Sequence, residues 1–174
     1  MRQGQHPGPP LEPRRLSLQA ESAGEYRVRL APGSELHAAV IAAAVDLGLV
    51  QATVSLLSGS FDRFSYLTGQ PDASGQRLAT YGAPTLLDGP VTLIGANGLI
   101  GSDPEGRALF HCHCVVADAQ GQVHGGHLPP EACVVGAGGL TLHLLGLAKA
   151  GFRVAYDSET NYPIFHPKAL EAAA

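Results

Sequence analysis

The feature that most limits the possible folds is a series of short apolar segments, separated by Gly, Pro and Asp, that begins at Leu49 and continues almost to the end of the chain. Segments of this length and spacing are typical of β-strands joined by turns. The sequence predicts strands at 49–57, 61–67, 76–81, 90–100, 108–117, 122–128, 131–136, 139–146 and 152–157. The polar stretch 68–76 is expected to be an exposed loop, and the composition of 144–150 also allows a helix.

The segments before this series predict one strand and one helix. Apolar and basic side chains alternate over 25–30, which is the pattern of a half-buried strand. Ser34 can cap a helix over 35–47, whose apolar stripe ends at Gly48. One flanking helix and many short strands predict a single α+β domain with a mostly antiparallel β-sheet.

The length of 174 residues suits one domain with a real hydrophobic core. Residues 1–22 are rich in Pro, Gly and Gln and predict a disordered arm, 23–167 the folded domain, and 168–174 a short tail. No apolar run approaches 18 residues, so we expect no membrane span. The first 15 residues lack the apolar centre of a secretory signal. We therefore expect a cytoplasmic protein, in which the odd number of cysteines, three, is consistent with reduced thiols.

The charge balance argues against nucleic acid as a partner. The chain has 11 basic and 15 acidic residues, for a net charge of −4. Three of the basic residues, Arg2, Arg14 and Arg15, lie on the proline-rich arm, which leaves the folded part more acidic still. Binding to a nucleic-acid backbone depends on clustered Lys and Arg side chains. Any DNA binding is therefore expected to be weak and to depend on the arm.

The segment 110–128, FHCHCVVADAQGQVHGGHL, carries the most specific chemical signal. Its two apolar halves predict a β-hairpin, and a three-residue loop with Gly121 in the left-handed region pairs residues symmetrically about Gln120. His113 then lies directly opposite His127, with Cβ atoms roughly 4.5–5.5 Å apart. His111 is two residues from His113 and shares its face of the strand. Three imidazoles are therefore predicted to converge.

Three histidines with an open fourth position are the ligand pattern of a catalytic zinc site. We predict that a zinc-type ion is held by His111, His113 and His127. The alternative metal set, on the opposite face of the hairpin, is Cys112, Cys114 and His124. The third possibility, packing without a metal, would leave each imidazole short of hydrogen bonds at roughly 1–3 kcal/mol apiece.

Further candidates are single residues. Glu159 follows an apolar strand and is a candidate proton-transfer group at the metal, and Arg63 is a candidate partner for a substrate carboxylate. His37, in the first turn of the helix, is expected at the surface. His143, in the middle of a strand, is expected in the core or at an interface.

The order of three motifs resembles the bacterial PPC (plants and prokaryotes conserved) domain over residues 22–167. The motifs are RVRLAPG at 27–33, LDGPVTLIGANG at 87–98 and the histidine hairpin. The resemblance implies an α+β domain that assembles as a homotrimer and binds a metal. The His-x-His and Gly-Gly-His elements also resemble acetolactate decarboxylase, a zinc enzyme, and by this match His111, His113 and His127 are the ligands.

Three functions follow as hypotheses. The first is a homotrimeric metal-binding protein with a small-molecule pocket at the histidines. The second is a metal-dependent lyase or hydrolase on a small carbonyl or carboxylate substrate, where the metal polarises an oxygen. The third is a DNA-associated regulator, as the family resemblance suggests, although the chain lacks the Arg-Gly-Arg-Pro core of the AT-hook found in plant members.

Overall fold

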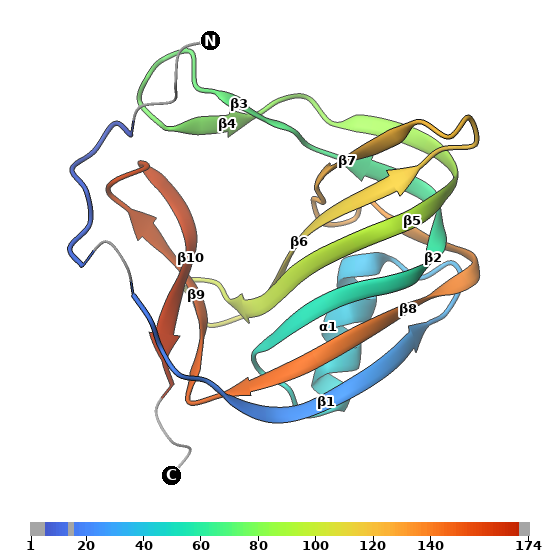
Figure 1. The fold of residues 1–174 in the computed structure, drawn as a ribbon, viewed down its shortest axis with the longest axis horizontal. Coiled ribbons are helices and arrows are strands. Elements are labelled where there is room, and N and C mark those ends of the chain that lie inside the picture. Colours follow the sequence, from blue (N-terminus) through green and yellow to red (C-terminus); the bar gives the residue numbers. More distant parts are fainter. Residues whose placement is uncertain (1–5, 14–15, 171–174) are drawn as a thin grey trace.

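The computed structural model describes residues 6–13 and 16–170 (Figure 1). Within them lie one helix, α1 (Leu36–Asp46), and ten strands. The strands are β1 (Glu21–Leu30), β2 (Ala52–Tyr66), β3 (Gly69–Pro71), β4 (Ala79–Tyr81), β5 (Thr85–Ser102), β6 (Ala108–Ala117), β7 (Val123–His127), β8 (Val134–Ala148), β9 (Ala150–Asp157) and β10 (Tyr162–Ala169). The predicted α+β fold with one helix and a mainly antiparallel sheet is confirmed.

Eight strands form one sheet whose main path runs β1-β8-β2-β5-β6-β7. All neighbours on this path are antiparallel. The β9–β10 hairpin joins the sheet at the end of β5 through a parallel bridge between Ser102 and Arg153. Strands β3 and β4 pair only with each other. The molecule thus consists of a six-strand path with two hairpins attached to it.

Two pairs of predicted strands are each one long strand. Residues 58–60, which have the composition of a turn, lie inside β2 as bulges opposite β8, and Gly59 has a φ of 139°. A Cβ there would stand 2.6 Å from the carbonyl oxygen of Gly139. Residues 137–138, between two predicted strands, likewise lie inside one strand, β8, at a shift in its register with β2. Bulges absorb extra residues and bend a strand without ending it. The helical alternative for 144–150 is wrong, because β8 continues to Ala148.

Smaller differences concern the ends of elements. Glu35, not Ser34, is the N-cap of α1, and its carboxylate accepts the Ala38 N–H at 2.7 Å. The predicted loop 68–76 contains β3, and β10 was not predicted. Strand β1 begins inside the predicted arm, and β10 ends inside the predicted tail. Residues 1–5, 14–15 and 171–174 of that arm and tail, including Arg2, Arg14 and Arg15, lie outside the described residues.

The core lies between α1 and one face of the sheet (Figure 1). Leu36 and Val40 of the helix are fully buried there. Along β6, Phe110 and Cys112 are buried in this core, as are Cys114 and Val116. Because side chains alternate along a strand, the odd-numbered residues of β6 lie on the opposite face. In the part of the chain that the structure describes, no helix is long and apolar enough to cross a membrane.

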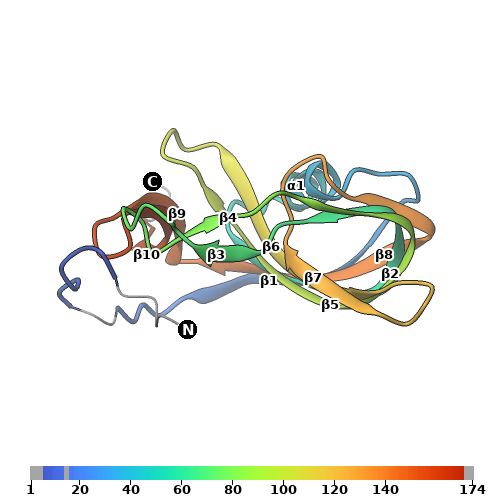
Figure 2. The same cartoon turned by 90° about the horizontal axis from the view of Figure 1, so that it is seen from above.

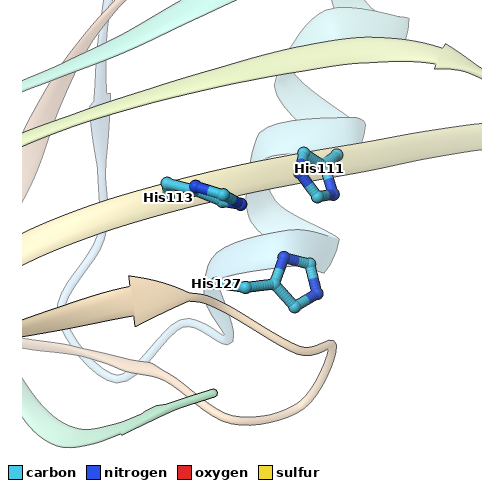
Figure 3. A group of neighbouring side chains, drawn as sticks. All are labelled: His111, His113 and His127. Atoms are coloured by element: carbon cyan, nitrogen blue, oxygen red, sulfur yellow. The ribbon is translucent and has the colours of Figure 1, made fainter. Parts of the chain in front are cut away.

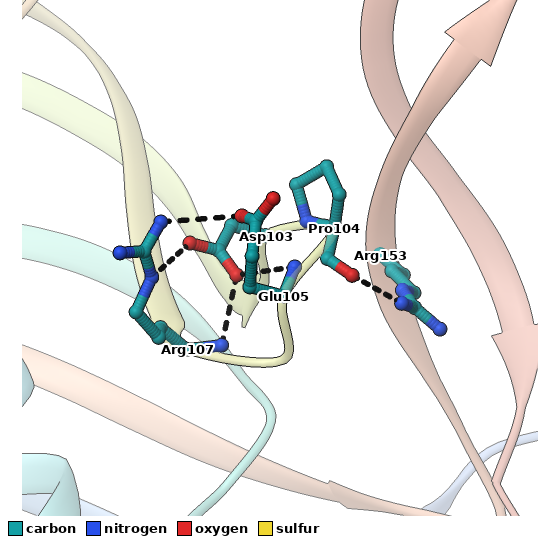
Figure 4. A network of polar contacts seen from close by, with 5 residues as sticks. All are labelled: Asp103, Pro104, Glu105, Arg107 and Arg153. Carbon is teal, nitrogen blue, oxygen red and sulfur yellow. Dashed lines mark hydrogen bonds and ion pairs between the residues drawn. The ribbon is translucent and has the colours of Figure 1, made fainter.

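The turn between β5 and β6 fixes the position of the β9–β10 hairpin (Figure 4). The Asp103 carboxylate accepts the backbone N–H groups of Glu105 and Arg107 and pairs with the Arg107 guanidinium at 2.7 Å. This closed turn presents the carbonyl oxygen of Pro104, to which Arg153 of β9 donates a hydrogen bond. The contact and the adjacent bridge hold β9 against the end of β5.

Candidate metal centre and cavity

Three histidine side chains converge on the sheet face opposite to the helix (Figure 3). His111 and His113 extend from β6, and His127 ends β7. One ring nitrogen of each lies within 4.8 Å of the corresponding atoms of the other two. The rings of His111 and His127 stack, with their centroids 4.6 Å apart and their planes at 26°. Among the described residues, this is the only group of three or more potential ligands so close together.

The hairpin turn explains why the histidines meet. The Asp118 N–H donates to the carbonyl oxygen of Gln122, and the Gly121 N–H donates to the carbonyl oxygen of Asp118. These two hydrogen bonds close the predicted loop. Gly121 has a φ of 76°, in the left-handed region that favours glycine. With this turn, His113 pairs with His127, as the sequence predicted. Local turn chemistry therefore sets the register of the candidate ligands.

A second connection fixes His127 from the other side. The backbone N–H of His127 donates to the carbonyl oxygen of Leu67 at 2.9 Å, and the Leu67 N–H donates to the carbonyl oxygen of His127 at 2.8 Å. The preceding residue is Gly126, where a Cβ would stand 2.3 Å from the Leu67 carbonyl oxygen. Only glycine permits so close an approach of the two backbones. The glycine pair before His127 is thus a structural requirement for the position of that histidine.

The surroundings of the cluster favour the neutral form of two of its imidazoles, His111 and His127. Burial, together with the nearby histidines, lowers the pKa of His127 to about 4. Burial also lowers the pKa of His111, again assisted by neighbouring histidines. Neutral imidazole is the form that binds a metal. The Nδ1 atom of His127 is buried and has no hydrogen-bond partner among the described residues.

The cluster can hold a tetrahedral ion if its ring nitrogens move closer together. Zinc–nitrogen bonds of about 2.0–2.1 Å place the nitrogens of neighbouring ligands roughly 3.4 Å apart. The ligand nitrogens of the cluster are at most 4.8 Å apart, and the buried Nδ1 of His127 has no hydrogen-bond partner among the described residues. The three residues present therefore fit a three-histidine metal centre with one position left for another ligand.

The alternative set of two cysteines and a histidine is not assembled. His124 contacts Asp118 at 2.9 Å and the Tyr66 hydroxyl at 3.4 Å, so both ring nitrogens have partners. Cys112 is fully buried in the core, and burial raises the pKa of its thiol to about 12. Burial also raises the pKa of Cys114. Protonated, buried thiols are poor metal ligands.

The two candidate catalytic residues lie away from the histidines. Glu159 is buried in the turn between β9 and β10, where its carboxylate pairs with His6 at 2.8 Å and accepts the Leu11 N–H. Arg63 donates to the carbonyl oxygen of Glu131. Neither residue lines the cavity described below. Their catalytic roles stay predictions.

The expectation for His37 was wrong. It is 5% exposed and packs against the Phe110 ring at 5.1 Å, on the core side of β6. Burial lowers the pKa of His37, so the ring is neutral in the core. His143 lies on β8 and pairs with Glu25 at 2.8 Å, with its side chain 29% exposed.

A cavity of about 890 Å³ opens in front of the three histidines. Its floor is formed by β5 and β6, and its walls are formed by the β3–β4 and β9–β10 hairpins. The wall residues include Tyr81 on β4 and Phe165 on β10. Figure 2 shows both hairpins at one end of the molecule, with α1 toward the other. The sequence did not identify these wall residues: Phe165 lies on β10, which was not predicted, and nothing in the predicted strand 76–81 placed Tyr81 beside the histidines.

The tips of the two hairpins are joined by hydrogen bonds at the rim of the cavity. Leu78 N–H donates to Thr160 at 3.0 Å, and the Asn161 amide donates to Gln76 at 2.8 Å. The Arg77 guanidinium lies 5.7 Å from the centre of the Tyr162 ring. Segments about 80 residues apart in the sequence therefore enclose one space beside the histidines.

The fold and the site define a class: a small strand-rich α+β domain with a three-histidine centre at a cavity. Residues 18–143 match the model of the Plants and Prokaryotes Conserved (PCC) domain. The chain therefore belongs to this family, which is also written PPC. Strands β9 and β10 lie beyond the matched residues. None of the curated proteins matches the chain.

Solved structures share the fold at low sequence identity. A metal-containing protein from Archaeoglobus fulgidus is 19% identical with a TM-score of 0.71, covering 87% of this chain and 99% of its own. A PPC protein from Pyrococcus horikoshii is 18% identical with a TM-score of 0.70, covering 90% and 100%. A candidate DNA-binding protein from Ralstonia eutropha is 20% identical with a TM-score of 0.64, covering 81% and 90%. The resemblance to acetolactate decarboxylase stays a prediction from the histidine motif of the sequence.

Proposed function

We propose that this protein is a homotrimeric metal-binding protein. In this proposal His111, His113 and His127 hold one zinc-type ion per chain, and a small molecule binds at the remaining coordination position. The observation that carries the proposal is the convergence of three ring nitrogens within 4.8 Å at the wall of a large cavity. The metal content of the similar Archaeoglobus protein is consistent with it.

Zinc is the proposed ion because the ligand set consists of imidazoles alone. Imidazole suits zinc and other late transition metals, whereas carboxylate sets suit magnesium and calcium. A bound zinc ion supplies Lewis acidity toward a carbonyl oxygen or a bound water. The chain's own residues position the ion, and the two hairpins form the walls of the space in front of it. Because the site is open to a cavity, a metal-dependent lyase or hydrolase on a small carbonyl or carboxylate substrate is the second candidate.

The metal proposal is tested by elemental analysis of the untagged protein, purified without chelators. We expect about one zinc per chain, and uptake of one equivalent by metal-free protein on titration. A protein that carries no metal and takes up none would contradict the proposal.

The trimer is proposed from the surface of the sheet as well as from the family resemblance. Exposed apolar side chains lie along β2, β5, β6 and β7: Leu57, Leu86, Ile94, Val115 and Val123. Exposed apolar side chains commonly mark an interface where they form a contiguous patch, and we infer such a patch on these strands. Light scattering should give three times the chain mass of 18.0 kDa. A mass of one chain at micromolar concentration would refute the trimer.

The remaining proposals concern compartment and nucleic acid. The three cysteines are free and buried, which is consistent with a cytoplasmic protein. The acidic balance of the chain continues to argue against the DNA-associated function, although the Ralstonia protein carries that description. We expect DNA binding to be weak and to disappear in about 0.2 M salt. Sequence-selective binding that survives this salt after removal of residues 1–20 would favour the regulator instead.

A further inference from the structure

We propose that the natural ligand of this cavity is an uncharged, largely apolar molecule, with an aromatic ring as its best-fitting body, that carries a single metal-binding head group. This inference rests on the proposed metal centre and adds the chemical class of its ligand. It is argued from the wall of the cavity, the stacking of its rings and its size.

The wall carries no charge besides that of the metal. Across residues 6–13 and 16–170, no Asp, Glu, Lys or Arg side chain lines the cavity. The wall is instead mostly apolar, with Leu99 and Leu109 on the floor and Val154 and Ile164 on the far hairpin. A phosphate or second carboxylate buried here would lack a cationic partner, at a cost of several kcal/mol. Nucleotides, sugar phosphates, amino acids and dicarboxylates are therefore poor ligands.

Aromatic rings continue the histidine cluster into the cavity. Tyr81 stacks on His127 with centroids 4.8 Å apart and planes at 16°. His127 stacks in turn on His111, and Phe165 meets the His111 ring edge-on at 6.1 Å. Offset and edge-to-face packing are the arrangements that planar aromatic ligands also adopt. A flat body whose head group reaches the metal would extend this series of rings.

The size of the cavity also separates ligand classes. A volume of about 890 Å³ is that of a pocket for a drug-sized molecule. A small hydroxy acid or keto acid bound at the three histidines would leave most of the apolar wall in contact with water. A larger apolar body would bury that wall, which is the main source of affinity in such pockets.

The decisive experiment measures the affinities of three hydroxamates for the zinc-loaded protein by calorimetry. Acetohydroxamate supplies the metal-binding head alone, benzohydroxamate adds an aromatic body, and succinic acid monohydroxamate adds a charged tail. Burial of a phenyl group should make benzohydroxamate bind roughly 50-fold more tightly than acetohydroxamate. The succinic compound should bind no more tightly than acetohydroxamate, and none should bind the metal-free protein comparably.

A variant of a cavity residue tests whether the preference for benzohydroxamate over acetohydroxamate arises in this cavity. Ala79 lines the cavity on β4 and is not a candidate ligand. Ala79→Phe should keep one zinc per chain and its affinity for acetohydroxamate, and lose most of the advantage of benzohydroxamate. The matched control is Ala108→Phe, at an exposed position of β6 outside the cavity, which should retain the full advantage.

The possible failures are distinguishable. If the protein binds no zinc, both the proposed metal centre and this inference are refuted. If zinc binds but the three hydroxamates have similar affinities, or the charged tail is preferred, only the inference about the ligand is overturned. Retention of the full benzohydroxamate advantage in Ala79→Phe would likewise overturn it.

Discussion

Replacing His113 with Ala should remove most of the stabilisation by zinc without harming the metal-free protein. The side chain is exposed on the sheet face opposite to the core, so its removal leaves no buried cavity. It also lies directly opposite His127, so its removal leaves only two of the three imidazoles. The metal-free variant should melt within about 1–2 °C of the metal-free wild type, because exposed substitutions usually cost under about 0.5 kcal/mol.

The size of the zinc effect follows from mass action. Zinc at 100 times its dissociation constant stabilises a folded protein by about 2.7 kcal/mol. For a chain of this length, each kcal/mol raises Tm by roughly 2–4 °C, so wild type should gain roughly 5–11 °C. Structural zinc sites contribute about 10–16 kcal/mol over four ligands, or roughly 3–4 kcal/mol per ligand. Losing one ligand should weaken binding roughly 100- to 1,000-fold. The same zinc concentration should then stabilise His113→Ala by about 0.4 kcal/mol or less.

The assay is thermal unfolding with and without zinc, followed by circular dichroism. The matched control is His143→Ala, which removes another partly exposed histidine of the same sheet, paired with Glu25 and outside the cluster. This control should keep the full rise in Tm. If His113→Ala keeps most of the rise, or if His143→Ala loses it, the three-histidine centre is refuted.

Three further predictions follow from the surroundings of the site. The metal-free protein should lose stability as the pH falls from about 6.5 toward 4, because unfolded histidine binds a proton in this range while burial holds the pKa of folded His127 at about 4. Urea unfolding at several pH values should show this loss, and it should be smaller in His127→Gln. Gly126→Ala should cost roughly 1–3 kcal/mol of unfolding free energy and weaken zinc binding. The control is Gly95→Ala, which should cost clearly less because a Cβ at Gly95 meets no atom within 4 Å. Equal costs for the two variants would contradict the close-contact argument. Native protein should resist thiol alkylation at pH 8, because burial raises the pKa of Cys112 to about 12, and rapid labelling of its thiols before unfolding would contradict their burial.

The histidine hairpin was predictable because its geometry is decided by neighbouring residues. Gly121 can adopt the left-handed conformation that the turn requires, and the turn fixes the register. Once the register is set, the alternation of a strand places His111 beside His113 and opposite His127. The helix was predictable for the same reason, since the apolar stripe and Gly48 lie within a few turns of each other.

The number of strands was harder to read, because bulges depend on the neighbouring strand. Residues 58–60 have the composition of a turn, and only pairing with β8 on one side and β5 on the other keeps β2 continuous through them. The burial of His37 was missed for a related reason. A histidine in a first helical turn is usually exposed, and only the packing of α1 on Phe110 buries this one.

The sequence by itself determined the candidate ligands, and the tertiary structure decided what surrounds them. Tyr81 and Phe165 reach the histidines through two hairpins that are far apart in the sequence and contact each other where Leu78 N–H donates to Thr160. The same packing places Glu159 against the N-terminal segment, away from the cavity. A turn is governed by the conformational preferences of a few residues, so it can be read locally. A cavity is the space left when distant segments pack, and it depends on contacts that no local pattern specifies.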